Sequence, residues 1–305
     1  MEPTPTVSLF QLFSPLRLLG PLSDRELRVA SRRVRNYALR SAYIVLLCLL
    51  MLSAWYSIVG LPDSTMKSLG ISRASAVSTY VAVQVLVFQF GAAQLLAALM
   101  LCSSLGDELR RATLGVLLTT PITSLHIVAG KLLGGLLQIV LLLAISLPVL
   151  AVLRALGGLS WEDVCAGFCI ILSAAAFAGA LSLLLSTYFP HPSRTITAGA
   201  VTYLILFIGL PFAATDLLRL VGLNPSLLGS LVDLLNPFRA IYLIAGPYNP
   251  LYPWLWRRLT PALSTSGNQA SLFFVALTAG PIVVMAVLGL YLLGRARRNV
   301  RRYVF

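Results

Sequence analysis

The sequence predicts an all-α membrane protein that crosses the bilayer six times, and three observations point to this fold class. Of the 305 residues, 58% are hydrophobic and only 11% are charged, whereas roughly a quarter of the residues in soluble domains carry charge. The mean hydropathy is +0.88. Charge-free runs of the roughly 20 residues needed to cross the hydrocarbon as a helix occur at Ser41–Gly60, Val77–Ser104, Leu132–Leu153, Val164–Phe189, Ile196–Thr215 and Ala270–Gly294.

These spans are expected to be helices, because unpaired backbone groups are too costly in lipid and the alternation of a barrel strand is absent. Residues 41–294 then form a six-helix transmembrane domain between a basic N-terminal segment, residues 1–40, and a basic tail, residues 295–305. The arginines and apolar residues of 25–40 favour a short interfacial helix. No cleavable signal peptide is expected, since the first apolar run is long enough to span.

The basic residues predict the orientation of the chain. Of its 23 lysines and arginines, 16 lie in segments that share one side with the N-terminus. The positive-inside rule therefore places both termini in the cytoplasm. This asymmetry also explains most of the net charge of +13, so that nucleic-acid binding is not needed to account for it.

The second apolar run is longer than a membrane requires. The 33 residues between Arg73 and Asp107 carry no charge and would measure about 50 Å as one helix. We expect this helix to tilt, to break near Gly91, or to project from the bilayer. Its three glutamines lie about 140° apart in succession, and two of them are expected to bond between helices rather than to line a substrate path. They are Gln84, Gln89 and Gln94.

Residues 106–131 interrupt the apolar pattern on the cytoplasmic side. A phosphate-binding loop is excluded there, because Leu125 stands where the motif needs glycine and Leu132 where it needs Ser or Thr after Gly130-Lys131. Thr120 suits an N-cap and Pro121 a first helical position. The pattern predicts a pair of short helices with apolar ridges, suited to docking against a partner, and Lys131 is expected to reach the membrane interface.

This segment, DELRRATLGVLLTTPITSLHIVAGKLLG, resembles the signature of ABC-2-type permeases, the membrane subunits of ATP-binding-cassette exporters. Leu109, Arg110 and Ala112 depart from the usual residues of the signature. The resemblance implies a homodimer or heterodimer of permeases that binds separate ATPase subunits through this segment. The coupling residues that it implies are Glu108, Arg110, Arg111, Thr113, Leu114, Leu117, Leu118, Thr120, Pro121, Ile122, Gly130 and Lys131.

The same resemblance implies that the chain has no ATPase site or other catalytic residue of its own, and that ATP and magnesium bind to the partner. It implies a bacterial plasma-membrane protein that exports a substrate or moves it between leaflets. The sequence does not name this substrate. We also weigh an ATP-independent carrier, channel or scaffold. A proton-driven carrier is disfavoured because no charged residue lies in the middle of a span, and a membrane-embedded enzyme because His126 and His191 lack catalytic partners.

The remaining features favour packing over chemistry. Small residues at four-residue spacing in the fourth span suit close helix packing inside the chain, or alternatively a dimer interface; they are Ala174, Ala176, Ala178 and Ala180. Prolines 148, 211 and 281 are expected to bend three spans. The cysteines predict neither a metal site nor a disulfide framework. They are Cys48, Cys102, Cys165 and Cys169.

Residues 216–268 form the longest connection between spans, on the side opposite the termini. Their tyrosines, tryptophans and prolines suit a belt at the membrane interface, with one short amphipathic helix expected within 227–243. A substrate gate made of Phe238, Trp254 and Trp256 is the alternative to interfacial anchoring.

Overall fold

The structure is a computed structural model. It describes residues 34–59, 73–102, 124–157, 160–189, 191–209 and 267–302, together with residues 213, 220, 236–238, 240 and 241. The described residues are helical or in turns and contain no strand, which confirms the all-α prediction for this part of the chain. The elements are α2 (Val34–Val59), α4 (Arg73–Leu101), α7 (Ser124–Ala155), α8 (Trp161–Tyr188), α9 (Pro192–Leu204), the π-helical turn η3 (Ile205–Gly209) and α14 (Gly267–Arg302).

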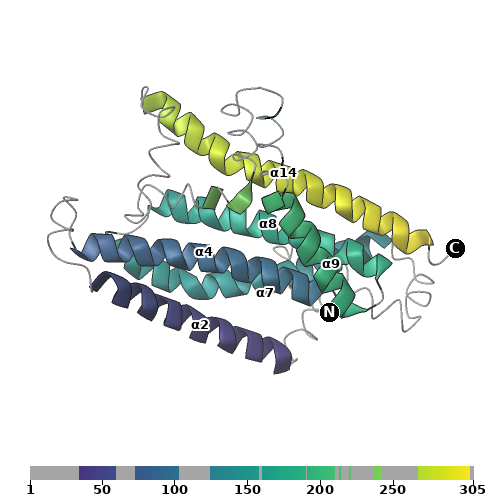
Figure 1. The fold of residues 1–305 in the computed structure, drawn as a ribbon, viewed down its shortest axis with the longest axis horizontal. Coiled ribbons are helices and arrows are strands. Elements are labelled where there is room, and N and C mark those ends of the chain that lie inside the picture. The colour runs from purple at the N-terminus through teal and green to yellow at the C-terminus, as the bar shows by residue number, and fades with distance from the viewer. Residues whose placement is uncertain are drawn as a thin grey trace, which may run out of the picture.

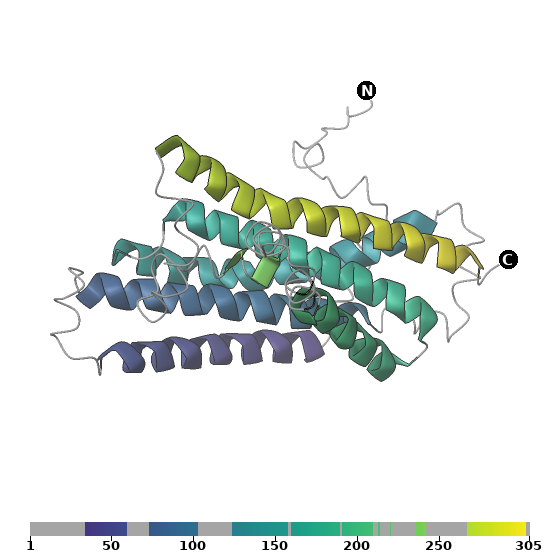
Figure 2. The same cartoon turned by 45° about the horizontal axis from the view of Figure 1, so that its top comes forward.

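Helices α2, α4, α7 and α8 run alternately in opposite directions, and α14 runs roughly parallel to α8, as Figures 1 and 2 show. Helix α8 lies at the centre, where it contacts α4, α7, α9 and α14. Helix α2 packs against α4 at the edge of the bundle, and α14 lies on the far side of α8 (Figure 1). A long helix is stable in this setting because all of its backbone groups bond within the helix, leaving none exposed to lipid.

Four described helices are long and apolar enough to cross a membrane. Their apolar stretches are Ser78–Leu101, His126–Ala155, Trp161–Tyr188 and Thr278–Val300. The first and fifth predicted spans coincide with α2 and α9, whose described apolar stretches, Ser41–Ser53 and Ser193–Phe207, are shorter. The structure therefore contains a helix at each predicted span, while the number of membrane crossings stays a prediction.

Several helices extend beyond the predicted spans. Helix α7 begins at Ser124 and runs through Gly130 and Lys131, and α14 continues through the basic residues to Arg302. Helix α4 is unbroken at Gly91, where an added Cβ would meet no atom within 4 Å. The expected break near Gly91 is therefore wrong, because an exposed glycine within a helix lowers its stability without interrupting its hydrogen bonds.

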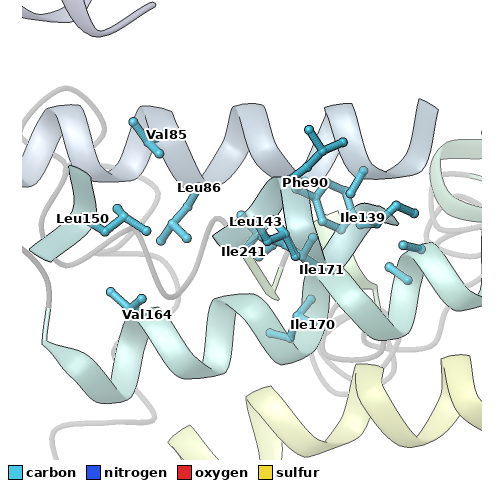
Figure 3. Packing of buried hydrophobic residues seen from close by; sticks show 14 of the residues in the cluster. Val85, Leu86, Phe90, Ile139, Leu143, Leu150, Val164, Ile170, Ile171 and Ile241 are labelled. Atoms are coloured by element: carbon cyan, nitrogen blue, oxygen red, sulfur yellow. The ribbon is translucent and has the colours of Figure 1, made fainter. Parts of the chain in front are cut away.

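The largest core cluster joins α4, α7 and α8. Figure 3 shows its side chains meeting between these helices, with Leu86 from α4, Leu150 from α7 and Val164 from α8 at one end. Three of the small residues of α8 lie inside the chain, since Ala174, Ala178 and Ala180 are buried, while Ala176 is half-buried. These three residues therefore pack within the chain, and the dimer interface stays a prediction.

The edge of the bundle is apolar and open. Helix α2 buries Tyr43 and Leu47, but most of its other large apolar side chains are exposed, among them Leu49, Leu52 and Trp55. Exposed apolar surface of this extent on a helix is costly in water and inexpensive in lipid. The pattern fits a helix that faces a bilayer.

Helix α8 begins at a capping box. The Ser160 hydroxyl accepts a hydrogen bond from the Asp163 amide (3.1 Å), and an Asp163 carboxylate oxygen accepts from the Ser160 amide (3.2 Å) and hydroxyl (2.7 Å). These bonds satisfy backbone donors that the helix itself leaves unpaired. The preceding turn passes through Gly157, whose φ of 91° is accessible to glycine with little strain.

Candidate functional site

The predicted coupling segment leaves one end of α4 and returns at the beginning of α7. Most of the residues assigned to it lie outside the described part of the chain: Glu108, Arg110, Arg111, Thr113, Leu114, Leu117, Leu118, Thr120, Pro121 and Ile122. Gly130 and Lys131 are described and lie on the second turn of α7. The structure thus defines the place where the segment joins the bundle.

This place is a compact contact between four helices, which we call the four-helix junction. It consists of Leu101 from α4, Val128 and Leu132 from α7, Leu183 and Leu184 from α8, and Ala296 and Val300 from α14. Each of these side chains is at most 7% exposed. The last turns of α4, α8 and α14 and the first turns of α7 therefore pack as one unit.

Glycines let the helices of the junction approach closely. A Cβ added at Gly179 of α8 would lie 2.6 Å from Leu101 Cδ1 and 2.8 Å from Leu132 Cδ1. A Cβ at Gly135 of α7 would lie 3.2 Å from a methyl carbon of Leu101. Leu101 is therefore enclosed by α7 and α8, and only a residue without a side chain fits at position 179 without a shift of its neighbours.

Polar groups complete the junction. The Asn299 side-chain nitrogen of α14 donates to the Thr187 hydroxyl of α8 (3.2 Å), and that hydroxyl donates to the Leu184 carbonyl (2.6 Å). Hydrogen bonds between helices in an apolar setting add roughly 0.6 kcal/mol each. They fix the position of α14 along α8 at this end of the bundle.

Lys131 lies inside this part of the bundle and does not extend to the surrounding solvent. Its side chain is 4% exposed, and Ile127 on the preceding turn is 0% exposed. The Lys131 side chain is therefore covered in this structure, whereas the sequence favoured a side chain that reaches the membrane interface. Gly130 is also buried, but an added Cβ would meet no atom within 4 Å, so Gly130 is not required for close packing.

The junction connects both ends of the predicted coupling segment to the same two helices. Leu101 precedes residues 103–123 and Leu132 follows them. The side chains of both leucines contact the position that a Cβ on Gly179 would occupy. Packed side chains transmit displacement because the interior has little free volume. A displacement of Leu101 or Leu132 would therefore be passed to α8 and α14 through direct side-chain contacts.

Sequence reasoning did not identify the residues that build this junction. Gly179 stands between Ala178 and Ala180, so the small-residue pattern was visible, but the alanines alone were interpreted as the packing face. Asn299 and Thr187 lie far apart in the sequence, and no local pattern pairs them. Among the described residues there is no group of three His, Cys, Asp or Glu side chains that could hold a metal ion.

Phe238, for which interfacial anchoring was favoured over a gate, is half-buried against the core. Its ring packs against Phe90 of α4, with 4.8 Å between centroids, and against Tyr203 and Phe207. Trp254 and Trp256, the other candidate gate residues, lie outside the described part of the chain.

Comparison with known proteins agrees with this architecture. No curated protein matches the chain. The profile of the family described as ABC-2 family transporter protein matches residues 36–297, which includes every described helix except the first two residues of α2 and the last five of α14. The match covers the apolar helices and the predicted coupling segment together, and the chain therefore belongs to the ABC-2 transporter family.

Proposed function

We propose that the chain is the permease subunit of an ABC-2-type transporter that moves a substrate across the membrane, or between its leaflets, using ATP hydrolysed by a separate ATPase. Family membership supports a membrane permease of this type and implies association with an ABC ATPase. In this proposal ATP and magnesium bind to that ATPase, and a second permease chain, identical or homologous, completes the transporter. The bundle crosses the membrane six times with both termini in the cytoplasm.

The observation that carries the coupling assignment is the four-helix junction. The segment that would receive the ATPase, from Glu108 to Ile122, lies in the sequence between Leu101 and Val128, which belong to one tightly packed contact with α8 and α14. A docking segment can drive a bundle only if it is rigidly connected to helices that move together. Arg110 and Arg111 are assigned to ion pairs with the ATPase, and Leu114, Leu117 and Leu118 to its apolar cleft.

A co-purification experiment tests this proposal. The tagged full chain is isolated from native membranes in mild detergent as wild type, as a Leu117→Asp, Pro121→Ala double variant, and as a His191→Ala control. His191 is exposed at the start of α9, makes no side-chain cap hydrogen bond, and precedes a helix that begins at the same end of the bundle. An ABC ATPase should accompany the wild type and the control and be lost from the double variant.

Two other outcomes contradict the proposal in different ways. An ATPase that remains bound to the double variant would refute the coupling role of residues 108–122, while the permease assignment would stand. Absence of an ATPase from all three samples would instead favour an ATP-independent membrane protein. Each sample should elute as a single species of unchanged size, so that loss of binding is separated from loss of folding.

A further inference from the structure

The end of the bundle where α8 and α14 finish carries positive charge (Figures 1 and 2). Arg295 and Arg298 of α14 are exposed there. Among the residues that the structure describes, the only carboxylates are Glu162 and Asp163, in the first turn of α8. They lie roughly 40 Å along that helix from its last residue, Tyr188. No described carboxylate therefore balances the two arginines, and their charge suits an anionic ligand.

Two tyrosines flank the Arg295 guanidinium between α8 and α14. Its Nη1 donates to the Tyr291 hydroxyl one turn earlier (3.4 Å), and the guanidinium also lies beside the Tyr188 hydroxyl. An arginine side chain carries five N–H donors and no acceptor, and a hydroxyl that accepts from it keeps its own proton to donate. Arg295 and Tyr291 together therefore present donors and a positive charge, which suit the oxygens of a phosphate.

The face of α14 that leads to Arg295 is apolar. Four residues at spacings of four, three and four share this face, which we call the seam row: Val284, Leu288, Tyr291 and Arg295. Leu288 is 36% and Tyr291 62% exposed, while Val284 is half-buried. Val284 packs against the cluster that contains Phe177 of α8. The seam row thus follows the border between α14 and α8 and is partly open to the surroundings.

The seam row has the length of half a bilayer. From Val284 to Arg295 it rises roughly 17 Å, compared with about 15 Å for half of the hydrocarbon core. Tyrosine is enriched where the hydrocarbon meets the headgroups, and the predicted last span ends at Gly294. A phospholipid with its phosphate at Arg295 can therefore extend an acyl chain along Leu288 toward Val284. A soluble phosphate would leave this apolar part without a use.

The inner side of the same turn is fixed by buried contacts. Ala296 is 0% exposed and belongs to the four-helix junction. Asn299 donates to Thr187, the residue that precedes Tyr188. The backbones that carry Arg295 and Tyr188 are thus held in place before a ligand binds. Such preorganisation favours binding because fewer groups lose their freedom when the ligand arrives.

We propose that the seam between α8 and α14 binds one anionic phospholipid, with its phosphate on Arg295 and Tyr291 and an acyl chain along the apolar part of the seam row. Arg298, exposed one turn farther along α14, adds positive charge that favours an anionic over a zwitterionic headgroup. Because the phosphate also lies near Tyr188, the lipid joins the ends of the two helices from outside. This site does not depend on the proposed function as a permease.

Lipid binding to the full-length protein tests the site. The protein is stripped of native lipid in a neutral detergent and titrated with dioleoyl phosphatidylglycerol, and native mass spectrometry counts the lipids that each chain retains. The test variant is Arg295→Gln. The matched control is Arg297→Gln, which removes the same charge from a position about 200° around the same helix. Two further probes are dioleoyl phosphatidylcholine, which has the same chains, and glycerol 3-phosphate, which has none.

Wild type and Arg297→Gln should retain one phosphatidylglycerol with equal dissociation constants. Arg295→Gln should raise this constant about fivefold, as expected for the loss of one arginine at a headgroup. Arg295→Lys keeps the charge but not the fork of N–H donors, and its constant should lie between the two. The lipid should also raise the melting temperature of the wild type and the control more than that of Arg295→Gln. Because Arg295 is exposed, its replacement should leave the elution volume of the protein unchanged.

Equal dissociation constants for Arg295→Gln and Arg297→Gln would overturn the site, whether both match the wild type or both are weaker. Phosphatidylcholine bound as tightly as phosphatidylglycerol would overturn the recognition of negative charge. Displacement of phosphatidylglycerol by glycerol 3-phosphate would overturn the lipid as the occupant in favour of a soluble phosphate, and a dimer that retains no lipid would do so in favour of a second copy of the chain. The permease assignment is tested separately, by the co-purification of an ATPase.

Discussion

Replacing Gly179 by alanine should destabilise the bundle although alanine is the better helix former. Two effects oppose one another at this position. Alanine within a helix gains about 1 kcal/mol over glycine, but the new methyl group would lie 2.6 Å from Leu101 Cδ1 and 2.8 Å from Leu132 Cδ1. Overpacking of a filled core costs about 1–3 kcal/mol. The net change is a destabilisation of about 0–2 kcal/mol.

A matched control removes the helix-propensity contribution. Gly91 also lies within a long helix, but an added Cβ there meets no atom within 4 Å. Gly91→Ala therefore gains the same propensity without overpacking, and the difference between the two variants isolates the steric cost of about 1–3 kcal/mol. This corresponds to a difference in melting temperature on the order of 5 °C.

The measurement is thermal unfolding of the purified variants in one detergent, followed by intrinsic fluorescence. Combining Gly179→Ala with Leu132→Val, which removes a methylene near the new methyl group, should cost less than the sum of the two single changes. If Gly179→Ala melts at or above the temperature of Gly91→Ala, the leucines have moved aside without cost and the description of a filled junction is wrong.

Three further substitutions test other features of the bundle. Ser160→Ala should lower the free energy of unfolding by about 1 kcal/mol through loss of the α8 capping box. The control Glu162→Gln, on the exposed side of the same turn, should change this free energy little. Equal stabilities of the two variants in thermal unfolding would contradict the role of the cap. Gln89→Met should leave the free energy of unfolding unchanged or raise it by about 1 kcal/mol. The reason is that Gln89 is 0% exposed and neither polar atom of its side chain makes a hydrogen bond of acceptable geometry. A clear loss of stability would reveal a polar partner. Asn299→Leu should lower the free energy of unfolding by about 0.6 kcal/mol through loss of the hydrogen bond to Thr187. If the two residues act as a pair, the double variant Asn299→Leu, Thr187→Val should be no less stable than Asn299→Leu alone.

Hydropathy predicted where helices occur because their apolar stretches must be long enough to cross lipid. It could not predict where they end. Helix α7 begins at Ser124 and α14 continues to Arg302, since backbone hydrogen bonds extend a helix through polar residues that no hydropathy window includes. The length of the apolar run in α4 was predicted. Its continuity through Gly91 was not, because that depends on how the whole helix packs against its neighbouring helices.

The sequence could not distinguish side chains that face lipid from those that face other helices, because both are apolar. Lys131 illustrates the limit: lysine near the end of an apolar run usually reaches the interface, yet its side chain is only 4% exposed here. Phe238 shows the same limit over a long range. An Asn-Pro pair is a recognisable helix start, and Asn236 is the first residue of such a pair. The hydrogen bond from the Asn236 side chain to the Phe207 carbonyl is known only once the chain has folded.

The four-helix junction also bears on how such a permease can change partners. Leu101 and Val128 belong to one cluster, so the chain leaves and re-enters the bundle at neighbouring points. A segment whose two ends are fixed side by side can be exchanged as a cassette, because a replacement of similar length has to close the same short gap. If residues 103–123 bind the ATPase as proposed, this segment can diverge, or be grafted from a homologous permease, to select a different ATPase while the rest of the bundle stays the same.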